Sequence, residues 1–214
     1  METPCEKLLG IHLSNDLSWD NHVTHVKSSL NQGIGMLRTL AYTIPPNYLR
    51  QLAQGLVLSK LRYGLSIYGT VRLSETDQES GQMRMLEVAV NDTMRVIERK
   101  NRRDLIPIAN LRASTKIPSA NQMAVQAITM EAWKIQNELS PAIADLMTPV
   151  RSTGIVTRAV MDRDVHVPYG GRVSRQSFHH QAAMLWNNAP KDIRECKKKT
   201  SVKNKIRSYS SLFP

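Results

Sequence analysis

The stretch DNHVTHVKSSLNQGIGMLRTLA, residues 20–41, contains the clearest periodic pattern of the chain. Its apolar residues recur at steps of three and four: Val23, Val26, Leu30, Ile34, Leu37 and Ala41. This spacing places them on one face of an α-helix. Ser18 is positioned to cap that helix, and Asp20 in its first turn suits the helix dipole. Gly33 and Gly35 would each cost about 1 kcal/mol relative to alanine in a helix interior, so we expect another backbone to approach there.

The sequence after this stretch predicts more helices. Pro45-Pro46 ends the first helix and starts a second, which ends near Gly64. The apolar positions of the second helix are Leu49, Leu52, Leu56 and Leu61 or Tyr63. A third helix is expected over residues 78–100, with these residues on one face: Met83, Leu86, Val90, Met94 and Ile97. A fourth, over residues 119–139, is apolar on two faces, which predicts burial between other elements.

Extended structure is expected only in short pieces. Residues 7–13 form a strand candidate followed by a turn at residues 14–16, and residues 65–69 form an extended connection. A short helix is expected at residues 141–147, and a loop at 149–176 contains a short strand at 165–167. Two amphipathic helices then follow, one with Phe178 and Trp186, the other with Val202 and Tyr209. The predicted fold class is therefore mainly α.

Charge and composition restrict the partners of the chain. The formal net charge is +11 and the pI is about 9.9, which favours a polyanion such as nucleic acid over other partners. General solubility is the plainer explanation of the same charge. Two distant cysteines, Cys5 and Cys196, give no disulfide framework or cysteine-rich zinc site. With no signal peptide at residues 1–10 and no apolar run of about 20 residues, we expect an intracellular protein of the nucleus or cytoplasm, without a membrane partner.

The lysines and arginines gather in clusters, which are the candidate nucleic-acid-binding residues. One cluster ends the third predicted helix, one surrounds the last predicted helix, and a cationic pair precedes Tyr63. Their members are Arg99, Lys100, Arg102 and Arg103; Lys197, Lys198, Lys199, Lys203, Lys205 and Arg207; and Lys60 and Arg62. Arg172 and Arg175 add charge to the predicted loop. Such density suits phosphate neutralisation, but cations also stabilise helix C-termini, and a solvated tail explains the last cluster equally well.

Catalytic and metal chemistry have little support in the sequence. No adjacent Asp-Asp pair follows an apolar strand, and the nearest approach, Asp162-Arg163-Asp164, has the pattern of a solvated loop. His22 and His25 lie one helical turn apart but have no third ligand nearby, and the adjacent His179 and His180 point to different helix faces. We therefore expect no cofactor and no catalytic or metal site. The large aromatic residues are predicted to be core anchors rather than base-stacking groups: Tyr63, Tyr68, Trp133 and Trp186.

The order of several motifs resembles a known family. KLLGI at residues 7–11, LSW at 17–19 and HV at 22–23 are similar to the segment after the catalytic strands of LINE-type (non-LTR) retrotransposon reverse transcriptases. LSKLRYG at 58–64 and IYG at 67–69 resemble the family's next helix end and turn, and Asn91, Arg95 and Ile97 match the following helix. AMLWNNAP at 183–190 with IR at 193–194 resembles the LWN-x-LP signature of jockey-like elements. Ala189 and Val202 depart from the leucine and phenylalanine usual there.

The resemblance implies the thumb and C-terminal region of an RNA-directed DNA polymerase. It divides the chain into a palm-closing hairpin remnant (1–18), a helical thumb-like bundle (19–148), a loop or linker (149–176) and a basic C-terminal helical appendage (177–214). The fingers and catalytic palm, with their Mg²⁺, would lie upstream of Met1, so we expect no polymerase activity from the chain alone. Its expected partners are an RNA–DNA or RNA duplex and the fingers and palm of a reverse transcriptase. Without that palm, the segment at residues 7–13 should be poorly ordered or shield its apolar face on the first helix.

Other functions remain open from the sequence. A decayed transposon remnant, or a helical protein-interaction module without a nucleic-acid role, fits the smaller residues at 189 and 202. A metal-dependent nuclease would depend on Asp162 and Asp164 alone.

Overall fold

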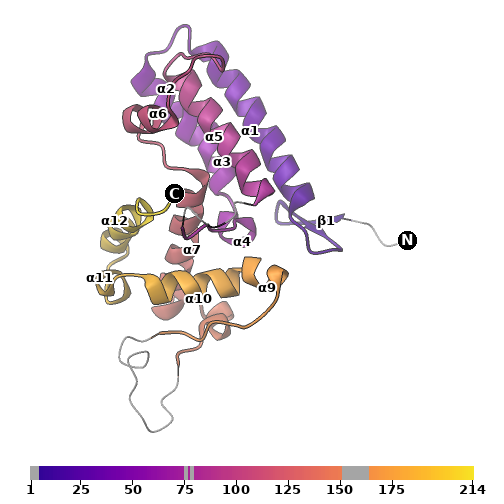
Figure 1. Cartoon of the computed structure of the whole chain (residues 1–214), viewed down its shortest axis with the longest axis vertical. Coiled ribbons are helices and arrows are strands. Elements are labelled where there is room, and N and C mark those ends of the chain that lie inside the picture. The colour runs from indigo at the N-terminus through magenta and orange to yellow at the C-terminus, as the bar shows by residue number, and fades with distance from the viewer. Residues whose placement is uncertain (1–4, 75–76, 78–79, 151–163) are drawn as a thin grey trace. The chain divides into compact units, whose positions relative to one another are not determined.

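The computed structural model describes residues 5–74, 77, 80–150 and 164–214. The chain is mainly helical with a short N-terminal antiparallel hairpin, which confirms the predicted fold class (Figure 1). It forms two compact units: unit 1 is Met1–Gly64 with Glu79–Ala120, and unit 2 is Leu65–Gln78 with Asn121–Pro214. The four-part division that the resemblance implies stays a prediction.

Unit 1 begins with the N-terminal hairpin that the resemblance implies, and the strand candidate at residues 7–13 is divided between its two strands. Strands β1 (Cys5–Leu8) and β2 (Ile11–Ser14) pair antiparallel, with Leu8 opposite Ile11. The chain reverses at Leu9 and Gly10, whose φ angles of 48° and 84° are both left-handed, as a two-residue hairpin turn requires. Glycine tolerates this backbone at little cost, and that explains why a continuous strand over residues 7–13 was wrong. β2 packs on the first helix and buries Ile11 there.

Helix α1 (Asp20–Leu40) contains the predicted apolar stripe, and every member of the stripe is buried. The predicted cap was wrong, because Trp19 holds the N-cap position and the Ser18 amide donates to Asp16 Oδ1 at 3.0 Å. A Cβ on Gly33 would lie 2.8 Å from the carbonyl oxygen of Leu56, so the predicted close backbone approach is present there. At Gly35 it is absent from the described residues, since nothing lies within 4 Å of such a Cβ.

The second predicted helix is continuous but changes its winding midway. It comprises α2 (Pro46–Ala53), a π-helical turn η1 (Gln54–Leu58) and α3 (Ser59–Arg62). The π turn adds a residue to the helical repeat, so the buried face moves. The buried residues are therefore Leu49, Ala53, Val57, Leu58 and Leu61. Leu52 and Leu56, predicted for this stripe, are only half-buried, and Tyr63 is exposed.

Helix α5 (Gly81–Ile97) completes the bundle of unit 1 with α1 and α2 (Figure 1). Its five predicted apolar residues are all buried. Ser80 caps the helix, its Oγ accepting from the Met83 amide at 3.2 Å. Helix α6 (Ile108–Thr115) forms in the stretch for which the sequence made no assignment, and it packs on α5.

Unit 2 is built mostly from short helices. They are α4 (Leu65–Tyr68), α7 (Ala120–Gln136), the 3₁₀ helix η2 (Pro141–Met147), α9 (Arg172–Gln176), α10 (Phe178–Asn188), α11 (Lys191–Arg194) and α12 (Lys199–Ser210). The extended connection predicted at residues 65–69 is thus the helical turn α4. The strand predicted at 165–167 is only a bridge of Val165 to Pro149, and α9 lies inside the predicted loop.

The core of unit 2 unites α7, α10, α11 and α12. It contains Trp133, Leu185, Trp186, Ile193 and Val202, among others. The indole N–H of Trp133 donates to the carbonyl of Cys196 at 2.7 Å, which fastens the α11–α12 connection to α7. The broad burial predicted for the fourth helix is present, although Ala127 and Met130 are only half-buried and Leu139 lies beyond the end of α7 and is exposed.

Candidate nucleic-acid interface

Helix α12 presents a row of positive charge. Lys199, Lys203 and Arg207 are four residues apart and all exposed. Side chains at this spacing share one face of a helix, with Cβ atoms about 5–6 Å apart. We call these three residues the α12 stripe. The other face of α12 is fixed in the core of unit 2 by Val202 and Ile206, so the stripe is held on a packed helix.

The stability of α12 does not explain this stripe. Like charges four residues apart destabilise a helix by about 0.2–0.5 kcal/mol per pair. Lys198 at the N-cap and Lys199 in the first turn also stand at the positive end of the helix dipole. No side-chain cap is formed at that end, and residues 197–214 contain no Asp or Glu. Arg207 in the last turn is favoured by the dipole, but the N-terminal half of the arrangement is electrostatically unfavourable for the isolated helix, and an external anion would relieve it.

The other lysines of this cluster differ in their surroundings. Lys205 Nζ donates to the backbone carbonyl of Asp192 at 2.8 Å and lies 3.4 Å from its carboxylate, so its charge is largely compensated. Lys197 Nζ donates to Asn137 Oδ1 at 3.3 Å, which leaves its charge uncompensated by that contact. Lys198 is exposed.

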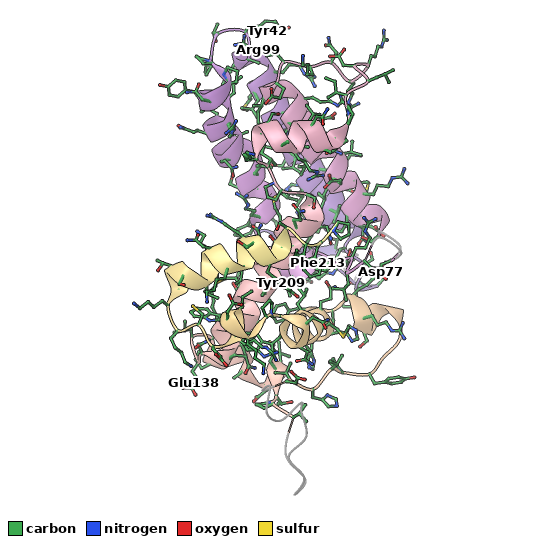
Figure 2. The ribbon with its side chains drawn as sticks, turned by 60° about the vertical axis from the view of Figure 1, so that its left-hand side comes forward. Tyr42, Asp77, Arg99, Glu138, Tyr209 and Phe213 are labelled. Atoms are coloured by element: carbon green, nitrogen blue, oxygen red, sulfur yellow. The ribbon has the colours of Figure 1, made fainter. Side chains whose placement is uncertain are left out.

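The Arg99–Arg103 cluster lies in unit 1, just after α5, and part of it has a structural role. Arg102 pairs with both oxygens of Asp92, and this hydrogen-bonded pair raises the pKa of Arg102. Arg99, with a φ of 54°, donates to the carbonyl of Ile44 at 3.2 Å, near Tyr42 in Figure 2. Lys100 and Arg103 are exposed, and neither has an ion pair within the described residues.

Lys60 and Arg62 belong to α3, at the opposite end of the unit 1 bundle. Lys60 Nζ donates to the carbonyl of Ser29 at 3.2 Å, and Arg62 Nη1 donates to Gln54 Oε1 at 2.7 Å. Tyr63 Oη donates to the carbonyl of Leu9 at 2.6 Å, which places this end beside the hairpin. Because α5 spans 17 residues, the ends of the bundle are roughly 25 Å apart. The structure therefore separates the predicted cations into three groups, two in unit 1 and one in unit 2.

The predicted aromatic anchors differ in their burial. Tyr68, Trp133 and Trp186 are buried, as predicted, whereas Tyr63 is 58% exposed, so its prediction as a core anchor was wrong. The helix ends at Tyr63, and the next residue, Gly64, has a φ of 66°. This change in backbone direction turns the Tyr63 ring out of the core.

Unit 1 also contains a histidine cluster. The rings of His12 and His25 have centroids 4.6 Å apart, and those of His12 and His22 are 6.1 Å apart. Burial, together with the neighbouring imidazoles of His12 and His25, lowers the pKa of His22 to about 4. Within residues 5–74, 77, 80–150 and 164–214, no group of three His, Cys, Asp or Glu is placed to hold a metal ion.

The remaining predicted residues lie in or near the loop of unit 2. Asp162 and Arg163 fall outside the described residues, and Asp164 forms an ion pair with Arg194 at 2.8 Å. Arg175 in α9 is exposed.

A cavity of 330 Å³ in unit 1 was not predicted. It is lined by Gly10, His22, His25, Val26, Ser29, Ser59, Lys60 and Tyr63. The hairpin turn, α1 and the end of α3 supply these residues from three separate stretches of sequence. In the sequence, only the pair of cations beside Tyr63 indicated a possible site at this place.

No helix in the described part of the chain has both the length and the apolar character to cross a membrane. Comparisons of the chain with protein-family models, curated protein sequences and solved structures found no match.

Proposed function

We propose that this chain binds the sugar–phosphate backbone of an RNA-containing duplex, with the α12 stripe as a principal contact. The proposal is supported by three exposed cations in register on a packed helix, where each is four residues from a like charge and Lys199 also stands at the positive end of the helix dipole. Phosphates would supply the missing anions, and their contact releases condensed counterions. Lys100, Arg103 and Lys198, each exposed, would add contacts without reading bases.

The resemblance to LINE-type reverse transcriptases indicates what role this binding would have. In the complete RNA-directed DNA polymerase, this region would hold the template-primer duplex, while the fingers and palm perform the chemistry. An A-form duplex presents phosphates and 2′-hydroxyls in a shallow minor groove and hides its bases in a narrow major groove. We therefore propose recognition by shape and charge, with no polymerase activity in this chain alone.

A salt series tests this function directly. The purified chain is titrated with a labelled RNA–DNA hybrid, and with a DNA duplex of equal length, from 50 to 300 mM salt. Contact with about five phosphates predicts a log–log slope near −4.5, with the hybrid bound more tightly. Equal and weak binding of both duplexes would contradict the proposal.

A protein-interaction role is the second candidate, and exposed leucines favour it. Leu8, Leu9 and Leu17 in and after the hairpin are 61%, 82% and 75% exposed. Such side chains suit contact with another protein, for which the fingers and palm of a reverse transcriptase are our proposed partner. Co-purification with a separately expressed palm, lost on Leu8→Ser with Leu9→Ser, would support this role.

A further inference from the structure

We propose that the 330 Å³ cavity of unit 1 is a subsite for one unpaired nucleotide, its phosphate on Lys60 and His25 and its base against Tyr63. This inference rests on the proposed function, since it assumes that the chain binds nucleic acid. It adds a second kind of contact, to a single-stranded segment next to the duplex.

The charge of the cavity suits a phosphate. Lys60 is half-buried, and its ammonium group is held by the carbonyl oxygen of Ser29, which leaves the positive charge uncompensated by that contact. The described residues that line the cavity include no carboxylate. His25 and Ser29 add side chains that can donate hydrogen bonds. A phosphodiester oxygen placed beside Lys60 would therefore meet one cation and two further donors.

Tyr63 offers a fixed aromatic surface beside this charge. Its hydroxyl donates to the carbonyl of Leu9 at 2.6 Å, and its ring lies against Gly10, where an added Cβ would be 3.5 Å from Cε1. The ring is nevertheless 58% exposed. A ring that is already immobilised loses little conformational entropy when a ligand stacks on it. Stacking of a base on such a ring tolerates every sequence, because each base has a π face.

The size of the cavity agrees with a nucleotide. Its 330 Å³ lies at the lower end of the roughly 300–1,000 Å³ typical of small-ligand sites. A base inside a duplex is stacked on both faces and cannot reach an aromatic surface without leaving its stack, so the site suits an unpaired nucleotide. The subsite would thus select a junction between duplex and single strand.

The test compares two labelled RNA–DNA hybrids, one blunt and one with a five-nucleotide single-stranded overhang. We expect the full chain to bind the overhang hybrid about tenfold more tightly. Lys60→Gln keeps a donor for the Ser29 carbonyl but removes the charge, and it should abolish this preference. Tyr63→Leu should abolish it as well, whereas Tyr63→Phe keeps the ring but loses the bond to Leu9 that fixes it, and should retain part of the preference. Lys116→Gln removes an exposed lysine of unit 1 outside the cavity and serves as the matched control.

Amide chemical shifts locate the contact. Titration of the ¹⁵N-labelled chain with a five-nucleotide oligonucleotide should shift the amides of Gly10, His25, Ser29 and Tyr63, and inorganic phosphate alone should shift them less. Equal binding of blunt and overhang hybrids by the wild-type chain would overturn the subsite. If α12 substitutions still weakened both hybrids, the proposed function would stand without it. If neither hybrid bound, the proposed function itself would fail.

Discussion

Gly33 is a residue at which α1 closely approaches the backbone of η1. A methyl group there would meet the backbone carbonyl of Leu56, and backbone cannot rotate away as a side chain can. Gly35 lies two residues further along α1, and a methyl group there would meet open space. Alanine substitution at each of these two positions therefore distinguishes the effect of close packing on stability from the effect of helix propensity.

We predict that Gly33→Ala lowers the free energy of unfolding by about 1–3 kcal/mol, because the clash outweighs the gain in helix propensity. Gly35→Ala should leave it unchanged or raise it by up to about 1 kcal/mol. Urea unfolding followed by circular dichroism measures both. Equal effects of the two substitutions would show that α1 and η1 are not in contact at Gly33.

His22 predicts a dependence of stability on pH. Its folded pKa of about 4 is below the unfolded value of 6.5, so the unfolded chain binds more protons between these limits. The stabilisation is complete above pH 6.5 and is lost as the pH falls towards 4. We expect a loss of about 2 kcal/mol from pH 7 to pH 4.5. His22→Gln keeps an acceptor for the His12 amide and should remove most of this loss, and an unchanged pH profile in that variant would count against the assignment.

Among the elements, the hairpin is held least firmly by packing against the rest of unit 1. A two-stranded hairpin is marginal in water by itself, and here only β2 packs on α1 while residues of β1 are mostly exposed. Tyr63 fixes the hairpin turn through one hydrogen bond to Leu9. The expected shielding on the first helix is therefore partial, since Ile11 is buried there while Leu8, Leu9 and Leu13 are exposed.

Hydrogen exchange should reflect this arrangement. We predict that amides of β1 and β2 exchange at least a hundredfold faster than those of α5, because opening the hairpin exposes little buried surface. Tyr63→Phe removes the bond to Leu9 and should speed hairpin exchange while leaving α5 unchanged. Equal protection of the hairpin and α5 in the wild-type chain would refute the prediction.

Sequence periodicity predicted the long helices well and the irregular elements poorly. The stripes of α1 and α5 follow a regular helical repeat, so their buried residues could be named in advance. The π turn η1 breaks that repeat within a continuous helix, and α4 is a single turn fixed by tertiary packing. Neither leaves a periodic signal, and for this reason Leu52, Leu56 and residues 65–69 were assigned wrongly.

The α12 stripe carries an element-scale prediction of its own. Lys199→Gln, Lys203→Gln and Arg207→Gln together remove two like-charge pairs and an unfavourable cation at the helix N-terminus, against the loss of one favourable cation, Arg207, in the last turn. We expect the triple variant to be at least as stable as the wild-type chain in thermal unfolding. A clear loss of stability would mean that these side chains have a structural role.

For the whole molecule, the distribution of charge over the two units matters most. The basic residues could be listed from the sequence, but their grouping could not, because it depends on which helix ends meet in three dimensions. Arg102 and Lys205 are compensated by Asp92 and Asp192, whereas the α12 stripe has no acidic partner among the described residues. The cavity around Lys60 could not be predicted either, because its lining comes from three separate stretches of sequence, at residues 10, 22–29 and 59–63.

The most direct measurement compares two triple variants that both lower the formal net charge from +11 to +8. One is the α12 triple variant, and the other replaces the exposed Arg38, Arg84 and Lys116 with glutamine. Binding to the RNA–DNA hybrid is measured for each across the salt series. We predict that the α12 variant loses about 2.7 from the magnitude of the log–log slope, while the control loses less than about 1. Equal losses in the two variants would contradict the account, because the charge would then act as a general basic surface.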